Sequence, residues 1–188
     1  MAARNDPPAV DPSGPVTAFL AVAELLRSPR LARLYAHVLR NGPVEVDAIK
    51  RELDLPHSTA YKYLGRLEEL GVLTRHDEAR PTTVTATPVR VGLDVDGETV
   101  SVTPVLIDAI GRQLEDDDVR LYVDRHGVPA LAAALHYARR VEDGELTQRT
   151  AANRLDVHPV EGLTALSALR DVLEEFAGAE TAPTETEE

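Results

Sequence analysis

Residues 46–76 read VDAIKRELDLPHSTAYKYLGRLEELGVLTRH, and the apolar spacing within them changes twice. A first helical period ends at Leu53. Pro56 then interrupts it, because proline has no backbone N–H to donate and disfavours a helix at the residue before it. A second helical period ends at Gly71, a residue type that commonly closes helices in the left-handed conformation. A short helix, a tight turn and a longer helix form a helix-turn-helix, whose second helix enters the major groove of DNA.

The second helix of this stretch has a polar face without acids. No Asp or Glu occurs from Leu55 to Leu67, although the chain as a whole is rich in both. Hydrogen-bonding and cationic side chains occupy this face and its margins, and such groups contact base edges and phosphates. They are His57, Ser58, Thr59, Tyr61, Lys62 and Arg66. We expect these residues to bind DNA; the alternative is an ordinary solvated helix of a helical bundle.

The run LDLPHSTAYKYL at residues 53–64 and the run LEELGVL at residues 67–73 resemble the winged helix-turn-helix regulators of archaea and bacteria. The resemblance covers about residues 30–90. In that family the Ser-Thr-x-Tyr-(Lys/Arg)-Tyr-Leu run begins the recognition helix, and the Glu-Leu-Gly-Val run leads into the wing. Lys50 departs from the family pattern, which often has a small residue between the two helices. The resemblance implies a DNA-binding regulator of transcription.

A β-hairpin is predicted directly after the second helix. Residues 72–76 and 82–87 flank a five-residue tip, and β-branched residues alternate along the second strand. This hairpin is the wing of the expected fold. Its cations Arg75 and Arg80 are available to a neighbouring phosphate or the minor groove, whereas the acids at its tip oppose deep insertion.

A second hairpin follows, with strands at residues 89–95 and 99–102. Asp96 and Gly97 between them form a strong two-residue turn signal. We expect this hairpin to be extra sheet that covers the winged core.

The overall charge excludes a general nucleic-acid coat protein. The chain has 188 residues and a formal net charge of −12. Arginine accounts for 18 of the 20 basic residues, and the only lysines, Lys50 and Lys62, both lie in the helix-turn-helix. Abundant acid and scarce lysine resemble the proteins of salt-loving archaea, whose hydrated surfaces keep them in solution. A DNA-binding protein in high salt gains little from long-range attraction and depends more on local contacts.

Several classes of protein are excluded by what the sequence lacks. Without cysteine there is no disulfide and no thiolate metal site. There is no run of 18 or more apolar residues and no hydrophobic signal segment, so we expect a soluble, cytoplasmic protein. The six histidines occur singly, without an HExxH pair or a nucleophile motif. We therefore expect no enzyme, no catalytic residue, no metal and no cofactor.

The expected fold class is α+β, mostly α, in which a winged helix-turn-helix domain is followed by a small all-α helical domain. The winged domain with its extra hairpin occupies residues 16–103, and the helical domain occupies residues 104–177. A proline-rich arm at residues 1–15 and an acidic tail at residues 178–188 are expected to be disordered.

The helical domain contains a second helix-turn-helix-like unit. Its run LTQRTAANRLDVHPVEGLTAL at residues 146–166 resembles antitoxin-type helix-turn-helix proteins of bacteria and archaea, and the domain resembles C-terminal domains of haloarchaeal regulators. The second helix of this unit begins at Val160, carries the acid Glu161 in its first turn and has no cation before Arg170. We therefore favour an oligomerisation or partner-binding module over a second DNA reader.

Together these features predict a sequence-specific regulator that binds double-stranded DNA as a homodimer, with residues 57–70 as the recognition helix. An apolar helix at residues 18–27 and a leucine stripe at residues 160–176 are both expected to contribute to the dimer. No membrane partner is expected, and a protein partner can bind the helical domain. The alternatives are a winged-helix adaptor that binds a protein, and an antitoxin-like repressor with a protein partner.

Overall fold

The computed structural model describes residues 14–78, 81–95 and 98–180. Most of the arm and of the tail that we expected to be disordered lies outside these residues, and so does Arg80. In chain order the elements are α1 (Pro15–Arg27), α2 (Pro29–Asn41), β1 (Val44–Glu45), α3 (Val46–Glu52), α4 (His57–Glu69), β2 (Leu73–His76), β3 (Thr83–Ala86), β4 (Val91–Val95), β5 (Glu98–Val102), α5 (Pro104–Arg112), α6 (Asp117–Glu142), α7 (Gln148–Ala152) and α8 (Pro159–Glu180).

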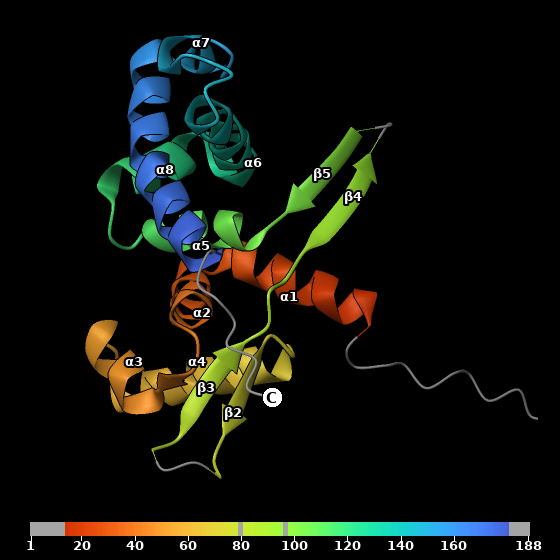
Figure 1. Ribbon diagram of the computed structural model, residues 1–188, viewed down its shortest axis with the longest axis vertical. Coiled ribbons are helices and arrows are strands. Elements are labelled where there is room, and N and C mark those ends of the chain that lie inside the picture. The colour runs from red at the N-terminus through yellow and green to blue at the C-terminus, as the bar shows by residue number, and fades with distance from the viewer. Residues whose placement is uncertain (1–13, 79–80, 96–97, 181–188) are drawn as a thin grey trace, which may run out of the picture.

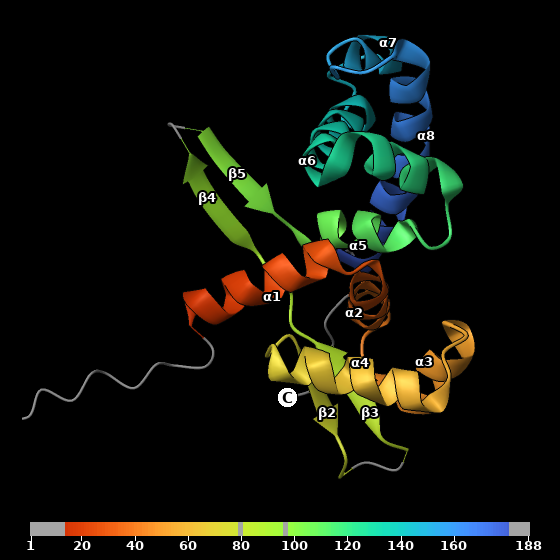
Figure 2. The same cartoon turned by 180° about the vertical axis from the view of Figure 1, so that it is seen from behind.

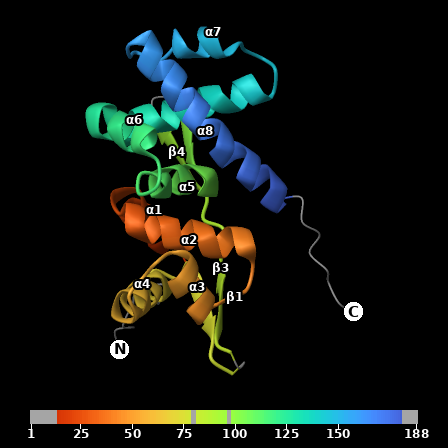
Figure 3. The ribbon, with the colours of Figure 1, turned by 90° about the vertical axis from the view of Figure 1, so that its left-hand side faces the viewer.

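Helices dominate the molecule, which confirms the expected α+β, mostly α fold (Figure 1). We call α2 to β3 the winged unit and α6 to α8 the helical unit. Figure 3 shows the helical unit at one end, α1, α2 and α5 in the middle, and α3, α4 and the wing at the other end. The buried apolar side chains form one cluster that runs through all three layers, so the two units share a core.

The sheet of the winged unit is small and antiparallel, with strand order β1-β3-β2. Val84 in the central strand pairs with Val44 on one side and with Arg75 on the other. Its side chain is fully buried, which anchors the wing to the helices above it. The hairpin of β2 and β3 is therefore the wing predicted from the alternating β-branched residues.

Both helices of the helix-turn-helix end in a Schellman motif, in which a residue with positive φ lets two backbone N–H groups turn back onto the last helical turn. After α4 this residue is Gly71, at φ 68°, as predicted. After α3 it is Asp54, at φ 50°. The N–H of Leu55 donates to the carbonyl oxygen of Lys50 over 2.9 Å, which closes the turn before Pro56. The turn thus sets the angle at which α4 leaves α3.

The hairpin of β4 and β5 differs from our expectation, because it is a separate two-stranded sheet and does not cover the winged core. Figure 2 shows it on the opposite side of α1 from the wing. The Tyr35 hydroxyl holds the connection to it, donating to the Thr87 carbonyl and accepting from the Val89 N–H, each over 2.9 Å. These two bonds redirect the chain after β3, so β4 cannot continue the wing sheet.

α5 forms the joint between the winged and helical units. It packs chiefly on α2 and also contacts α1, α6 and α8. At Gly111 the two helices come so close that an added Cβ would lie 2.8 Å from backbone atoms of Arg33. Glycine is required here because any side chain would displace one backbone from the other.

Two helices, α1 and α8, depart from the expected boundaries, and α6 contains a kink. α1 begins at Pro15 instead of Ala18, because proline's fixed φ suits the first helical position. The kink of α6 is at Gly127, where φ is 79°. α8 is longer than expected, and three of the four leucines of its predicted stripe are buried within the chain, namely Leu166, Leu169 and Leu173.

Candidate nucleic-acid interface

α4 buries one face and leaves the other open, as its apolar period predicts. Ala60, Leu64 and Leu67 are completely buried against the winged core. Ser58 and Lys62 lie on the opposite side and are exposed. Lys62 makes no ion pair or hydrogen bond with any residue that the structure describes. Its ammonium group is therefore available to an outside partner.

Tyr61 is the centre of an aromatic and cationic cluster on one margin of this face. The residue is 39% exposed, and its ring lies 4.6 Å from the ring of His57, centroid to centroid. The Lys50 ammonium nitrogen lies 6.0 Å from the ring centre and the Arg75 guanidinium carbon lies 5.6 Å from it. Cations at such distances are attracted to the face of a tyrosine ring. Two cations, from α3 and β2, thus lie beside this ring on the margin of α4.

Lys50 is a member of this site that we did not predict as a contact. It also pairs with Asp47 one turn earlier on α3. The scarcity of lysine was the available signal, because both lysines of the chain lie on this surface.

Two predicted arginine contacts are held by acids of the chain itself. Arg66 donates from Nε to Glu24 Oε1 over 2.7 Å and from Nη1 to Glu69 Oε2 over 2.8 Å, and its Nη2 also bonds Glu24. Arg75 pairs with Glu68 over 2.5 Å and is largely buried. Both guanidinium groups lie beside the exposed face of α4, but neither is free like the Lys62 ammonium.

Thr59 lies on the other margin of α4, in a groove of about 440 Å³ between α2 and the turn before α4. Arg30 at the start of α2 lines the same groove and forms no ion pair among the residues that the structure describes. Arg80, the remaining predicted contact, lies outside the described residues. The structure therefore brings His57, Ser58, Tyr61 and Lys62 together on one surface, with Thr59 and Arg30 at its edge.

The charge of the winged segment differs from that of the rest of the chain. Residues 30–90 contain ten Lys and Arg and eight Asp and Glu, a net charge of +2 within a chain of −12. The remaining residues are correspondingly strongly acidic. A local positive balance on an acidic protein concentrates an anionic partner on one surface.

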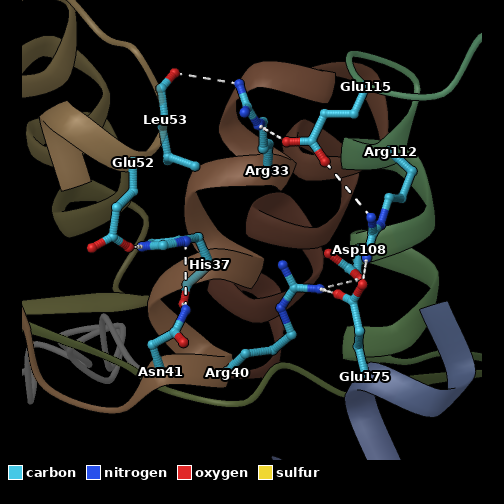
Figure 4. A network of polar contacts seen from close by, with 10 residues as sticks. All are labelled: Arg33, His37, Arg40, Asn41, Glu52, Leu53, Asp108, Arg112, Glu115 and Glu175. Carbon is cyan, nitrogen blue, oxygen red and sulfur yellow. Dashed lines mark hydrogen bonds and ion pairs between the residues drawn. The ribbon is translucent and has the colours of Figure 1, made fainter. Parts of the chain in front are cut away.

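A network of ion pairs connects the winged unit to α5 and α8 (Figure 4). Asp108 of α5 is only 3% exposed, and its carboxylate accepts from Arg40 of α2 over 3.0 Å. Glu175 of α8 pairs with both Arg40 and Arg112. Burial raises the pKa of Asp108 to about 6, although Arg40 and Arg112 act in the opposite direction. A lone acid in the apolar run VLIDAIG was the sequence signal for this buried carboxyl.

The same network reaches α3 through two other residues of α2. His37 lies 3.2 Å from a Glu52 carboxylate oxygen, and burial lowers the pKa of His37 despite that neighbour. Arg33 pairs with Glu115 over 2.6 Å and approaches the Leu53 carbonyl. One helix, α2, therefore contacts the helix-turn-helix on one side and the joint helix on the other.

Neither a metal site nor a membrane-spanning helix occurs among the residues that the structure describes. They contain no set of three or more His, Asp, Glu or Cys side chains placed to hold a metal ion. Among their helices, none combines the length and the apolar character needed to cross a membrane.

Comparisons with known proteins separate the chain into two segments. Neither the curated proteins nor the solved structures include a match to it. Residues 113–178 match a family described as a family of unknown function (DUF7437). Residues 30–90 match the family described as the sugar-specific transcriptional regulator TrmB. This match coincides with the winged unit and with the extent of the resemblance in the sequence. Residues 30–90 therefore form a winged helix-turn-helix domain similar to that of the TrmB transcriptional regulators.

Proposed function

We propose that this chain is a sequence-specific transcription regulator that binds double-stranded DNA and reads the major groove with α4. The observation that carries the proposal is Lys62, an exposed lysine on the outward face of α4 without an ion pair among the described residues. In a chain of net charge −12, an unpaired cation on that face is best explained by an anionic partner. Phosphates and guanine edges of DNA are such partners. The similarity of residues 30–90 to transcription regulators supports the same conclusion.

The side chains around Lys62 divide into two proposed roles. Ser58 and Lys62 point away from the core near the start of α4, where recognition helices contact base edges. The cluster of His57, Tyr61, Lys50 and Arg75 faces the phosphates of one strand, and Thr59 with Arg30 faces those of the other. Arg80 of the wing tip is a proposed additional phosphate contact.

The ligand named for the similar family is not part of this proposal. The match to the sugar-specific regulators ends at residue 90, and the helical unit matches a different family. The acidic, lysine-poor composition instead supports a cytoplasmic protein of a salt-loving archaeon. In high salt the phosphate contribution is screened, so contacts to base edges must supply more of the affinity.

We also propose that the protein binds DNA as a homodimer through α1. This helix buries Ala21, Val22 and Leu25 but leaves a second apolar stripe at Val16, Phe19 and Leu20, which are 66%, 47% and 56% exposed. A helix with apolar residues on two opposite faces needs a second surface to cover it. A two-fold axis at α1 allows two copies of α4 to reach major grooves about 34 Å apart. Because three of the four leucines of α8 are buried within the chain, α1 is the proposed main contact.

The helical unit provides the proposed site for a protein partner. Leu121, Val160 and Leu163 are the large apolar side chains exposed on this unit, apart from those that the structure does not describe. Leu121 and Val160 line one groove together with Glu161. Arg125 and His126 of the same groove both contact the Glu161 carboxylate. Apolar side chains beside charges that are already paired suit a protein segment better than they suit DNA.

Substitution of Lys62 tests the proposed function. Preferred duplexes are first selected from a random DNA library with the wild-type protein, and affinities are then measured by fluorescence anisotropy. Lys62→Ala should weaken the preferred duplex by about 5- to 150-fold, the value of one base or phosphate contact. Its melting temperature should stay near that of the wild type, because the Lys62 side chain forms no ion pair or hydrogen bond with the residues that the structure describes.

Arg139→Ala is the matched control, because Arg139 is an exposed cation of α6 without an ion pair in the described residues. It should leave the affinity unchanged. Wild-type affinity in Lys62→Ala would refute α4 as the recognition helix and favour the adaptor alternative.

A further inference from the structure

The two exposed cations of α4, Lys62 and Arg66, differ in their ionic partners. Lys62 has no ionic partner in the described part of the chain, whereas Arg66 has two. The stronger of these is Glu24 of α1, whose two carboxylate oxygens accept from Nε and Nη2 of the guanidinium. This is the two-pronged geometry with which arginine also binds a phosphate group. Glu24 therefore occupies the donors of Arg66 that a DNA phosphate would use.

The pair lies at an accessible place beside the proposed DNA surface. The Arg66 side chain is 44% exposed and that of Glu24 is 31% exposed. Both residues line a groove of about 580 Å³ that also includes Lys62 and Gly65 of α4. A Cβ added at Gly65 would meet no described atom within 4 Å, so the surface of α4 is open at this position. A phosphate that enters this groove can reach the guanidinium once Glu24 releases it.

The pair is strong enough to persist in the free protein and weak enough to exchange. The hydrogen bonds from Arg66 lower the pKa of Glu24, so this carboxyl remains ionised at neutral pH. Ion pairs at exposed positions are nevertheless screened by solvent and contribute little to folding. The principal consequence of the pair is therefore that it determines what Arg66 can bind.

We propose that Glu24 is a specificity-determining residue, which competes with DNA phosphate for Arg66 and withholds this cation from DNA that does not dock closely. This inference rests on the proposed function and adds to it. Complexes with non-preferred DNA depend mainly on phosphate contacts, so removing one cation from the available set lowers their affinity. A preferred sequence draws α4 deeper into the groove, where a phosphate replaces Glu24 on Arg66.

Glu24→Gln tests the proposal, because it keeps the size of the side chain and removes its charge. Its affinity for a random-sequence duplex should rise about 3- to 10-fold. The plot of log affinity against log salt concentration should become steeper by about 0.9, the value of one additional phosphate contact. The ratio of preferred to random affinity should fall. Arg66→Gln should weaken the preferred duplex and leave the random duplex unchanged, since Arg66 does not contact the latter in the wild type.

The double variant Glu24→Gln with Arg66→Gln separates this mechanism from a general effect of charge. In that background the loss of Glu24 should change neither affinity nor salt slope. Glu142→Gln at the end of α6 makes the same change of net charge far from α4 and should behave as wild type. The proposal is overturned if Glu24→Gln leaves random-duplex binding unchanged, weakens it, or strengthens it equally without Arg66. A failure of the proposed function is distinct, because Lys62→Ala would then also retain full binding in the same assay.

Discussion

Asp108 illustrates how a single residue can make stability depend on pH. Its carboxyl is buried in α5 among Arg40, Arg112, Glu115 and Glu175, and burial raises its pKa from an ordinary value of 3.8 to about 6. A carboxyl whose pKa is raised holds its proton more tightly in the folded chain than in the unfolded chain. Its contribution to stability is therefore largest at low pH and decreases as the pH rises toward 6.

We expect this decrease to be visible when the wild type is compared with Asp108→Asn, which cannot titrate. Between pH 5 and pH 7.5 the free energy of unfolding of the wild type should fall by about 1 kcal/mol relative to that of the variant. Chemical denaturation at constant salt measures the difference at each pH. A difference that is constant, or that grows with pH, would show that the two arginines outweigh burial.

At the same scale, the sequence predicts which side chains are exposed but not which residues they contact. The helical period placed Lys62 on an open face and Leu64 in the core, and both positions are confirmed. It did not show that Arg66 is bound to Glu24, because the two residues are 42 positions apart and belong to helices whose crossing the sequence does not specify. Periodicity fixes the side of a helix on which a residue lies, but not the neighbour that it contacts there.

At the scale of elements, the turn between α3 and α4 depends on the backbone of Asp54. A positive φ is costly for most residues, tolerated by Asp and Asn, and free of strain for Gly. Asp54→Ala should therefore destabilise the fold by about 1 kcal/mol, whereas Asp54→Gly should not destabilise it. Both variants lose the same carboxylate, so thermal or denaturant unfolding of the pair separates backbone strain from charge. Equal losses in the two variants would assign the effect to the carboxylate.

The elements that could be predicted are those whose ends have a local chemical cause. Pro56 and Gly71 mark helix ends because proline and glycine restrict or free the backbone at their own positions. The position of the hairpin of β4 and β5 could not be predicted, because it depends on the Tyr35 hydroxyl, which bonds the chain 52 and 54 residues later. The wing was predictable as a hairpin, but its attachment through Val84 required the fold.

At the scale of the whole molecule, the apolar stripe of α1 should decide the oligomeric state. Phe19→Asp places a charge in the middle of this stripe and should convert a dimer into a monomer at tens of micromolar protein. Light scattering or sedimentation measures the mass directly. Leu163→Asp is the matched control, because Leu163 is an exposed apolar residue of the helical unit, and it should leave the mass unchanged. A wild-type protein that is already monomeric at this concentration would contradict the dimer.

The close packing at Gly111 determines where this chain can be divided to exchange domains with another protein. The two segments that match known families end at residue 90 and begin at residue 113, so α5 belongs to neither. Yet α5 is seated on α2 by the glycine that lets the two backbones touch. In a chimaera with a foreign C-terminal part, a junction after β5 would remove α5 and expose the face of α2 on which α5 packs. A junction after Arg112 would keep α5 on α2, so the transferable module is the winged unit together with α5.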